Sequence, residues 1–120
     1  MIARNHRFHG LNSLRIVYKL GRTTRQQQLT LRHHLNERRQ TYRCAVVVSK
    51  KVEKSAVRRN RIRRRIFEAV RQQQDLINKP YDLVIGVYSQ TLTDMPSQEL
   101  RLQVKDLLAA AGVIDAKPQR

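Results

Sequence analysis

The chain has 120 residues, with 25 Lys and Arg against 9 Asp and Glu, and a formal net charge of +16. Its length fits about one domain, at roughly 100–200 residues per domain, and no apolar run approaches the ~18 residues of a membrane span. The lone cysteine, Cys44, excludes an internal disulfide and builds no zinc site by itself, so we expect one cytoplasmic, soluble domain over 1–120 with a polyanionic partner.

The first half of the chain predicts a short helix followed by strands. Asn12 or Ser13 can cap the helix, and Gly21 can end it. Alternating leucines and a β-branched run then predict two strands with one buried face each. The expected elements after the helix are a loop at 22–27, a strand at 29–35, a turn at 36–41 and a strand at 42–49.

The second half predicts two amphipathic helices around one strand. A helix over 55–73 is indicated because four apolar side chains fall within one narrow arc at 3.6 residues per turn, namely Ile62, Ile66, Ala69 and Val70. A strand at 81–88 and a helix at 97–112 follow. The predicted class is an α/β (α+β) two-layer sandwich, with one sheet of about four strands and three helices. Residues 1–6 and 115–120 are expected to be flexible.

The positive charge is unevenly distributed along the chain. Residues 1–49 carry +9, residues 50–71 carry +8, and residues 72–120 carry −1. Arginine supplies 18 of the 25 cations, and its guanidinium suits bidentate phosphate contacts and stacking on bases. This pattern indicates a nucleic-acid-binding surface centred on the helix at 55–73.

Residues for catalysis or for metal binding do not form a recognisable pattern. The glycines stand singly, so no Gly-rich phosphate loop is present, and the adjacent His33 and His34 would face opposite sides of a strand. Metal-dependent phosphodiester hydrolysis usually needs convergent carboxylates, but residues 1–71 hold three acidic side chains, widely separated. We therefore predict no catalytic residue and no metal ligand, and a surface that binds phosphate rather than cleaving it.

The basic segment resembles the protein subunit of bacterial ribonuclease P. The resemblance rests on Ser49-Lys50-Lys51 at a strand end, then Ala56-Val57, then Arg59-Asn60-Arg61-Ile62-Arg63-Arg64 on the helix, and it extends over residues 4–114. Glu53-Lys54-Ser55 stands where the family often has a glycine in the turn. The family's fold implies a left-handed crossover from the strand at 42–49 through the helix to the strand at 81–88.

The resemblance implies a function within a ribonucleoprotein. The chain would be a subunit of an RNA-dependent endoribonuclease that removes the 5′ leader from precursor tRNA. Its partners would be the catalytic RNA and precursor tRNA, with no membrane and no obligate protein partner. The RNA would be the catalyst and would hold most of the Mg²⁺.

Two binding surfaces are predicted on this basis. The first would bind phosphates of the catalytic RNA, and its residues are Lys50, Lys51, Arg58, Arg59, Asn60, Arg61, Arg63 and Arg64. The second is a groove for the single-stranded leader between the first helix and the sheet, and its residues are Phe8, Leu14, Tyr18, Arg32, Val46 and Ser49. Leu14 and Arg32 depart from the residue types frequent at these positions in the family. Phe67, Tyr81 and Tyr88 are interpreted as core residues.

An alternative interpretation is a ribosomal or general structural RNA-binding protein with no role in tRNA processing. Such a protein would share the charge and the sheet but would not need a leader groove. A stand-alone nuclease is disfavoured by the scarcity of carboxylates in the basic half, and a DNA-binding protein by the lack of a helix-turn-helix pair or a heptad zipper.

Overall fold

The computed structural model describes residues 6–8 and 11–114. In chain order its elements are α1 (Leu11–Leu20), β1 (Arg22–Gln26), β2 (Leu29–Leu35), β3 (Arg43–Val48), α2 (Ala56–Arg71), η2 (Gln74–Leu76), β4 (Tyr81–Val87), η3 (Gln90–Thr93) and α3 (Ser97–Ala110). The ends expected to be flexible lie outside the described residues, except His6, whose ring stacks on Tyr42 with centroids 4.1 Å apart. No helix in the described ranges has the length and apolarity needed to cross a membrane.

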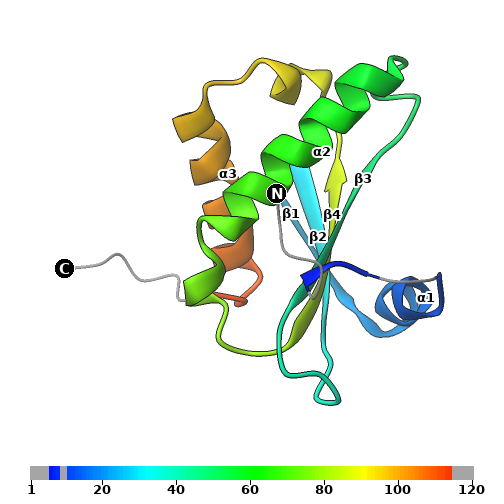
Figure 1. The fold of residues 1–120 in the computed structure, drawn as a ribbon, viewed down its shortest axis with the longest axis vertical. Coiled ribbons are helices and arrows are strands. Elements are labelled where there is room, and N and C mark those ends of the chain that lie inside the picture. The colour runs from blue at the N-terminus through cyan, green and yellow to red at the C-terminus, as the bar shows by residue number, and fades with distance from the viewer. Residues whose placement is uncertain (1–5, 9–10, 115–120) are drawn as a thin grey trace.

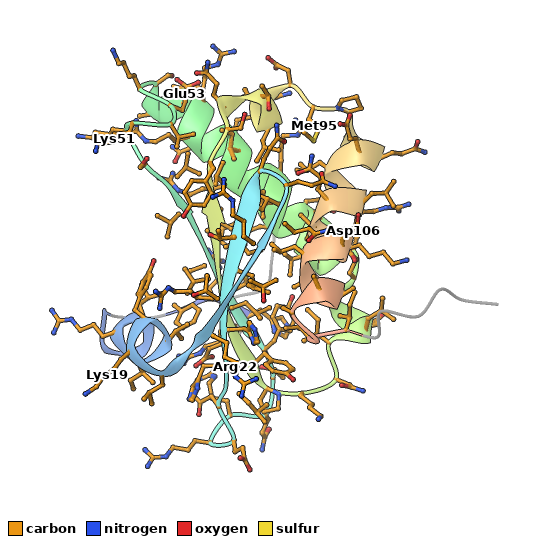
Figure 2. All side chains as sticks on the ribbon, turned by 180° about the vertical axis from the view of Figure 1, so that it is seen from behind. Lys19, Arg22, Lys51, Glu53, Met95 and Asp106 are labelled. Carbon is orange, nitrogen blue, oxygen red and sulfur yellow. The ribbon has the colours of Figure 1, made fainter. Side chains whose placement is uncertain are left out.

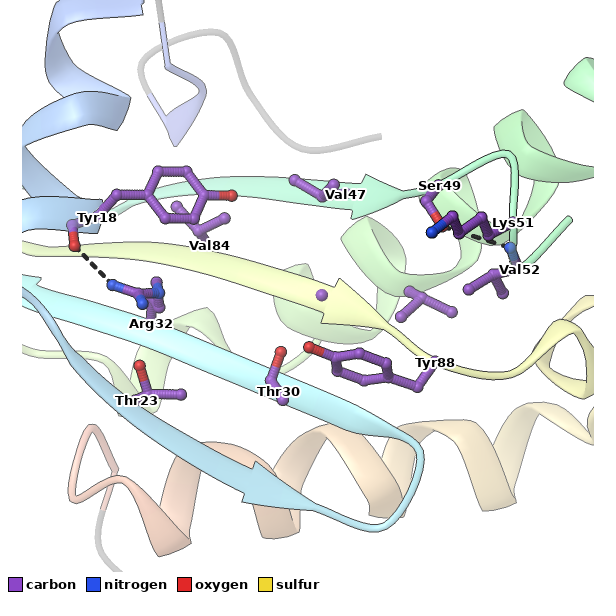
Figure 3. A pocket seen from close by; sticks show the side chains of 12 residues that line it. Tyr18, Thr23, Thr30, Arg32, Val47, Ser49, Lys51, Val52, Val84 and Tyr88 are labelled. Carbon is purple, nitrogen blue, oxygen red and sulfur yellow. Dashed lines mark hydrogen bonds between the residues drawn. The ribbon is translucent and has the colours of Figure 1, made fainter.

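The strands form one mixed sheet in the order β1-β2-β4-β3. β2 pairs antiparallel with β1 and β4, whereas β3 and β4 are parallel neighbours joined through α2. α2 and α3 lie on one side of the sheet and α1 on the other (Figure 1). With α2 toward the viewer and the parallel strands pointing upward, β4 lies to the left of β3, and the opposite view in Figure 3 agrees. The crossover is therefore left-handed, the rare sense that the resemblance implied.

The hydrophobic core lies between the sheet and the two helices α2 and α3. The four side chains predicted to share one arc of α2, Ile62, Ile66, Ala69 and Val70, are all buried. Alternate residues of β2, β3 and β4 meet them, including Leu31, Val46 and Ile85. Full burial of side chains of this size contributes about 1.5–3 kcal/mol each, so this face fixes which side of the sheet stays open.

The first strand of the sheet was not predicted from the sequence, because residues 22–27 were expected to be a loop. They form β1, an edge strand that pairs from Arg22↔His33 to Gln26↔Leu29. Its side chains are exposed or half-buried, so the strand lacks the alternating apolar pattern that signals a buried face. The connecting turn is Gln27-Gln28, where Gln27 adopts φ +54, and this pair lacks the Gly or Asn that usually marks a hairpin.

The start of α2 is fixed by the turn that precedes it. Ser55 is the N-cap, and its hydroxyl accepts a hydrogen bond from the Arg58 backbone N–H at 3.3 Å. The buried Glu53 carboxylate accepts from the Ser55 N–H at 3.1 Å and lies 3.6 Å from the Arg58 guanidinium. The side-chain contacts of Glu53 therefore order this turn, in which the resembled family often has a glycine.

A buried ion pair closes one end of the open sheet face. Arg43 on β3 donates two hydrogen bonds to the Asp82 carboxylate on β4, at 2.9 and 2.8 Å. Asn36 donates a third at 3.1 Å, and the Phe8 ring lies 4.5 Å from the Arg43 guanidinium. Asp82 is 1% exposed and Arg43 is 6% exposed. This end of the face is therefore closed, and a groove can open only farther along the strands.

Candidate nucleic-acid interface

A groove of about 480 Å³ runs across the open face of the sheet. α1 borders one end of it, and the turn after β3 borders the other (Figure 3). The side chains around it are mostly apolar, hydroxyl-bearing, aromatic or cationic. They are Tyr18, Thr23, Thr30, Arg32, Val47, Ser49, Lys51, Val52, Val84, Gly86, Val87 and Tyr88.

Three of the six residues predicted for this groove line it, namely Tyr18, Arg32 and Ser49. Arg32 donates a hydrogen bond to the Tyr18 backbone oxygen at 2.6 Å, and its guanidinium carbon lies 5.2 Å from the centre of the Tyr18 ring. Tyr18 is 47% exposed. An exposed ring beside a cation suits stacking with a base and contact with a phosphate.

The other three predicted residues do not line the groove. Val46 is buried in the core, because successive strand residues point to opposite faces and Val46 shares its face with Cys44 and Val48. Its neighbour Val47 lines the groove instead and is 44% exposed.

Phe8 and Leu14 are the remaining two. Phe8 lies against Arg43 at the closed end of the face, and Leu14 is half-buried on α1. The sequence pattern could not place them, because neither residue belongs to a strand with a defined alternation of faces.

Tyr88 was interpreted as a core residue, but it lies at the edge of the groove and is 55% exposed. It directly follows the last residue of β4, at the point where the chain leaves the sheet. The guanidinium carbon of Arg25 lies 5.0 Å from the centre of its ring. Phe67 and Tyr81 do pack against the core, as expected. The signal that separates Tyr88 from them is its place at the strand end, before the Ser89 N-cap of η3.

The side chains predicted to bind the catalytic RNA lie on and just before α2, and they divide into two groups. Lys50, Lys51 and Arg64 are exposed, with no hydrogen-bond or ion-pair partner in the part of the chain that the structure describes. Figure 2 shows Lys51 projecting outward from the turn before α2. Arg58 makes only long contacts, at 3.6 Å to Glu53 and 3.5 Å to Asp94. These cations are available to external phosphates.

The second group of α2 arginines donates hydrogen bonds to other groups of the protein itself. Arg59 donates to the carbonyls of Glu53 and Lys54 at 2.9 and 2.8 Å. Arg61 is an exposed residue and donates to the Thr93 carbonyl at 2.9 Å through Nε. Arg63 donates to the Asn60 side chain. Their charges remain, but the orientation of each guanidinium is set from within the protein.

Arg65 belongs entirely to this second group. It donates to the carbonyls of Leu92 and Thr93 at 2.7 and 2.8 Å, and also to that of Met95. Partial burial lowers the pKa of Arg65, and the nearby Arg61 charge lowers that pKa further. Arg65 therefore holds the segment around η3 against α2, and it was not among the side chains predicted to bind RNA.

Burial and hydrogen bonding also shift the pKa values of other side chains. Burial raises the pKa of the Cys44 thiol to about 12, so the thiol stays protonated at neutral pH. A hydrogen bond from Arg71 holds the pKa of Glu68 below its usual value, and the same contact raises the pKa of Arg71. Within residues 6–8 and 11–114, no three His, Cys, Asp or Glu side chains converge to hold a metal ion.

A groove edged by tyrosines beside a strongly basic helix defines a small basic α+β protein of the nucleic-acid-binding class. The family model described as Ribonuclease P matches residues 2–112. A ribonuclease P protein component of Synechococcus elongatus is 30% identical over 97% of this chain and 98% of its own length. The chain belongs to the ribonuclease P protein family, as the resemblance indicated.

Two further comparisons concern the sequence and the fold. A ribonuclease P protein component of Chloroflexus aurantiacus is 39% identical over 66% of this chain, and the match spans 58% of the length of that relative. The RNase P protein of Staphylococcus aureus superposes with a TM-score of 0.80 over 92% of this chain and 98% of its own, at 24% identity. That superposition confirms the predicted α+β fold.

Proposed function

We propose that this chain is the protein component of a bacterial ribonuclease P that acts in the cytoplasm. It binds the catalytic RNA and the 5′ leader of precursor tRNA, and it assists endonucleolytic removal of that leader. Membership of the ribonuclease P family supports the proposal. Each RNA partner would occupy one of the two surfaces described above.

The observation that carries the proposal is that the two surfaces meet at one turn. Ser49 and Lys51 line the groove, and this turn leads through Ser55 directly into α2. Lys51 therefore belongs to the groove and to the cationic surface at once (Figures 2 and 3). A leader in the groove would lie next to an RNA bound along α2, which is what positioning a substrate on an RNA catalyst requires.

In this mechanism the chain supplies binding and charge neutralisation. Exposed cations such as Arg64 and Lys50 offset repulsion between RNA phosphates and so lower the Mg²⁺ concentration needed for the active RNA fold. The Mg²⁺ ions would be held mainly by the RNA and would stabilise the charge of the scissile phosphate. Tyr18 and Arg32 hold an unpaired leader of varied sequence, because a stacked base is recognised by its flat face rather than by its edges.

Reconstitution tests this proposal directly. We expect the protein, added to a ribonuclease P RNA at low Mg²⁺, to stimulate cleavage of precursor tRNA at the mature 5′ end. Protein alone serves as the control and should not cleave. Cleavage without RNA would contradict the proposal, and so would RNA binding without any stimulation. The second result would favour the general RNA-binding alternative.

Tyr18→Ala tests the groove. We expect the variant holoenzyme to bind precursor tRNA more weakly by about 1–3 kcal/mol, because one base loses its stacking partner. Affinity for mature tRNA, which has no leader, should be unchanged in the same titration. Tyr18 is half exposed, so its removal should leave the fold intact. Equal losses for both RNAs would show that Tyr18 does not contact the leader.

A further inference from the structure

The end of the groove opposite α1 repeats the arrangement found at the α1 end. Tyr88 is 55% exposed and has the Arg25 guanidinium carbon 5.0 Å from its ring centre. Tyr18 is 47% exposed and has the Arg32 guanidinium carbon 5.2 Å from its ring centre. Figure 3 shows the two rings at opposite ends of the same groove. The groove therefore carries a tyrosine–arginine pair at each end.

Each pair combines a π-face with a positive charge. The guanidinium polarises the ring and reinforces its attraction for a base that stacks on it, and its charge lies within reach of the adjoining phosphate. About half of the Tyr88 side chain is exposed even though Arg25 lies over the ring. The protein itself therefore leaves much of this ring without a packing partner.

The two rings are too far apart to stack on one base. The Tyr88 N–H donates to the Gln28 carbonyl at 2.9 Å, which fixes Tyr88 beside the start of β2. Arg32 lies four residues along the chain from Gln28, a separation of about 13 Å in an extended strand. The rings must hold different bases, with a stretch of RNA between them.

Small residues line the groove between the two rings, which leaves room for that stretch of RNA to cross. Thr30 and Gly86 are paired across β2 and β4 and both line the groove. A Cβ at Gly86 would lie 2.7 Å from the Thr30 hydroxyl, which is too close. The glycine therefore makes room for the Thr30 side chain and adds no side chain of its own to this part of the groove. The Thr30 hydroxyl can donate or accept, so it can bond to any base without fixing the sequence.

We propose that Tyr88, supported by Arg25, is a second stacking site for the leader, separated from the Tyr18 site by the Thr30–Gly86 floor. This inference rests on the proposed function, because it places a second base of the same leader in the same groove. Its consequence is a dependence on leader length. A short leader reaches only one of the two rings, and a longer leader reaches both.

Holoenzyme reconstituted with precursor tRNAs whose leaders are shortened one nucleotide at a time tests the inference. For the unaltered protein we expect affinity to rise in two steps as the leader grows. Tyr88→Ala should remove one step, a loss of about fivefold to 150-fold, and Tyr18→Ala should remove the other. Tyr88→Phe keeps the ring and should keep the step. Arg25→Gln should reduce the Tyr88 step without abolishing it.

Leu102→Ala is the matched control, because Leu102 is also 55% exposed but lies on α3, outside the groove lining. It should leave both steps intact. If Tyr18→Ala removes a step while Tyr88→Ala changes nothing, the second site is wrong and the proposed function stands. If affinity of the unaltered holoenzyme does not depend on leader length at all, the leader groove itself is wrong. A loss with Tyr88→Ala that is equal for every leader and for mature tRNA also overturns the inference.

Discussion

Asp82→Ala is expected to destabilise the protein by about 3–5 kcal/mol, the usual cost of breaking a buried ion pair by removing one partner. The Asp82 carboxylate accepts two hydrogen bonds from Arg43 and one from Asn36. Its removal leaves the buried Arg43 guanidinium without this carboxylate in a region of low dielectric. Urea unfolding of the isolated protein measures the loss, and the midpoint of thermal unfolding should fall by roughly 10 °C or more.

Asp94→Ala is the matched control for this loss. Asp94 also faces an arginine, Arg58, but at 3.5 Å and with its own side chain 75% exposed. Exposed pairs contribute about 0–1 kcal/mol, so this variant should unfold nearly as the unaltered protein does. The double variant Arg43→Met with Asp82→Leu should recover much of the stability that Asp82→Ala loses, because it removes both buried charges. Equal stability of Asp82→Ala and Asp94→Ala would show that the pair contributes little.

Much of the fold could be predicted where burial imposes a period on the sequence. The arc that ends with Ala69 and Val70 marked α2, and alternating leucines marked β2, because each element buries one face against the same core. β1 was missed because its side chains are exposed or half-buried on both faces, so no buried face imposes an alternating apolar pattern on its sequence. The handedness of the crossover came from the resemblance alone, since local patterns do not encode it.

The groove could be predicted only in part, for a related reason. Tyr18 and Ser49, which the resemblance assigned to the groove, line it. The choice between Val46 and Val47 depends on which face of β3 is open, and both faces of that strand carry valines. Tyr88 follows a strand with an almost continuous apolar run, so its exposure appears only in the folded chain. The resemblance thus implied where the groove lies, but the side chains that line it could be assigned only in part.

The sequence alone also could not show which arginines of α2 have partners within the protein. Arg61, Arg64 and Arg65 are alike in sequence and nearly adjacent on the helix. Only the folded chain shows that η3 supplies carbonyl partners to Arg61 and Arg65, while Arg64 has no partner among the described residues. A run of like charges therefore contains side chains that hold the fold as well as side chains that are available to RNA.

This division predicts different outcomes for neighbouring arginines. Replacing the available cations together, as Lys50→Ala, Lys51→Ala and Arg64→Ala, should weaken binding to the catalytic RNA. If each exposed cation contributes up to about 1 kcal/mol, the triple variant binds up to about 150-fold more weakly. The slope of log K against log salt should flatten by roughly one unit for each phosphate that the variant no longer binds. Titrations at several salt concentrations measure both quantities. Thermal unfolding should be nearly unchanged, because the three side chains bond to nothing within the described residues.

Arg65→Ala is the matched control, since it removes the same charge from the same helix. It leaves the Leu92 carbonyl without its donor and the Thr93 carbonyl with Arg61 as its remaining donor, and hydrogen bonds from a charged group contribute about 1.5–3 kcal/mol each when they are well buried. Arg65 is only partly buried, so a loss of stability at the lower end of that range is expected, with a smaller change in salt slope than Arg64→Ala causes. Unchanged slopes in the triple variant would remove this part of α2 and its turn from the RNA interface. Equal slope changes for Arg64→Ala and Arg65→Ala would show that net charge, rather than the availability of each side chain, governs binding.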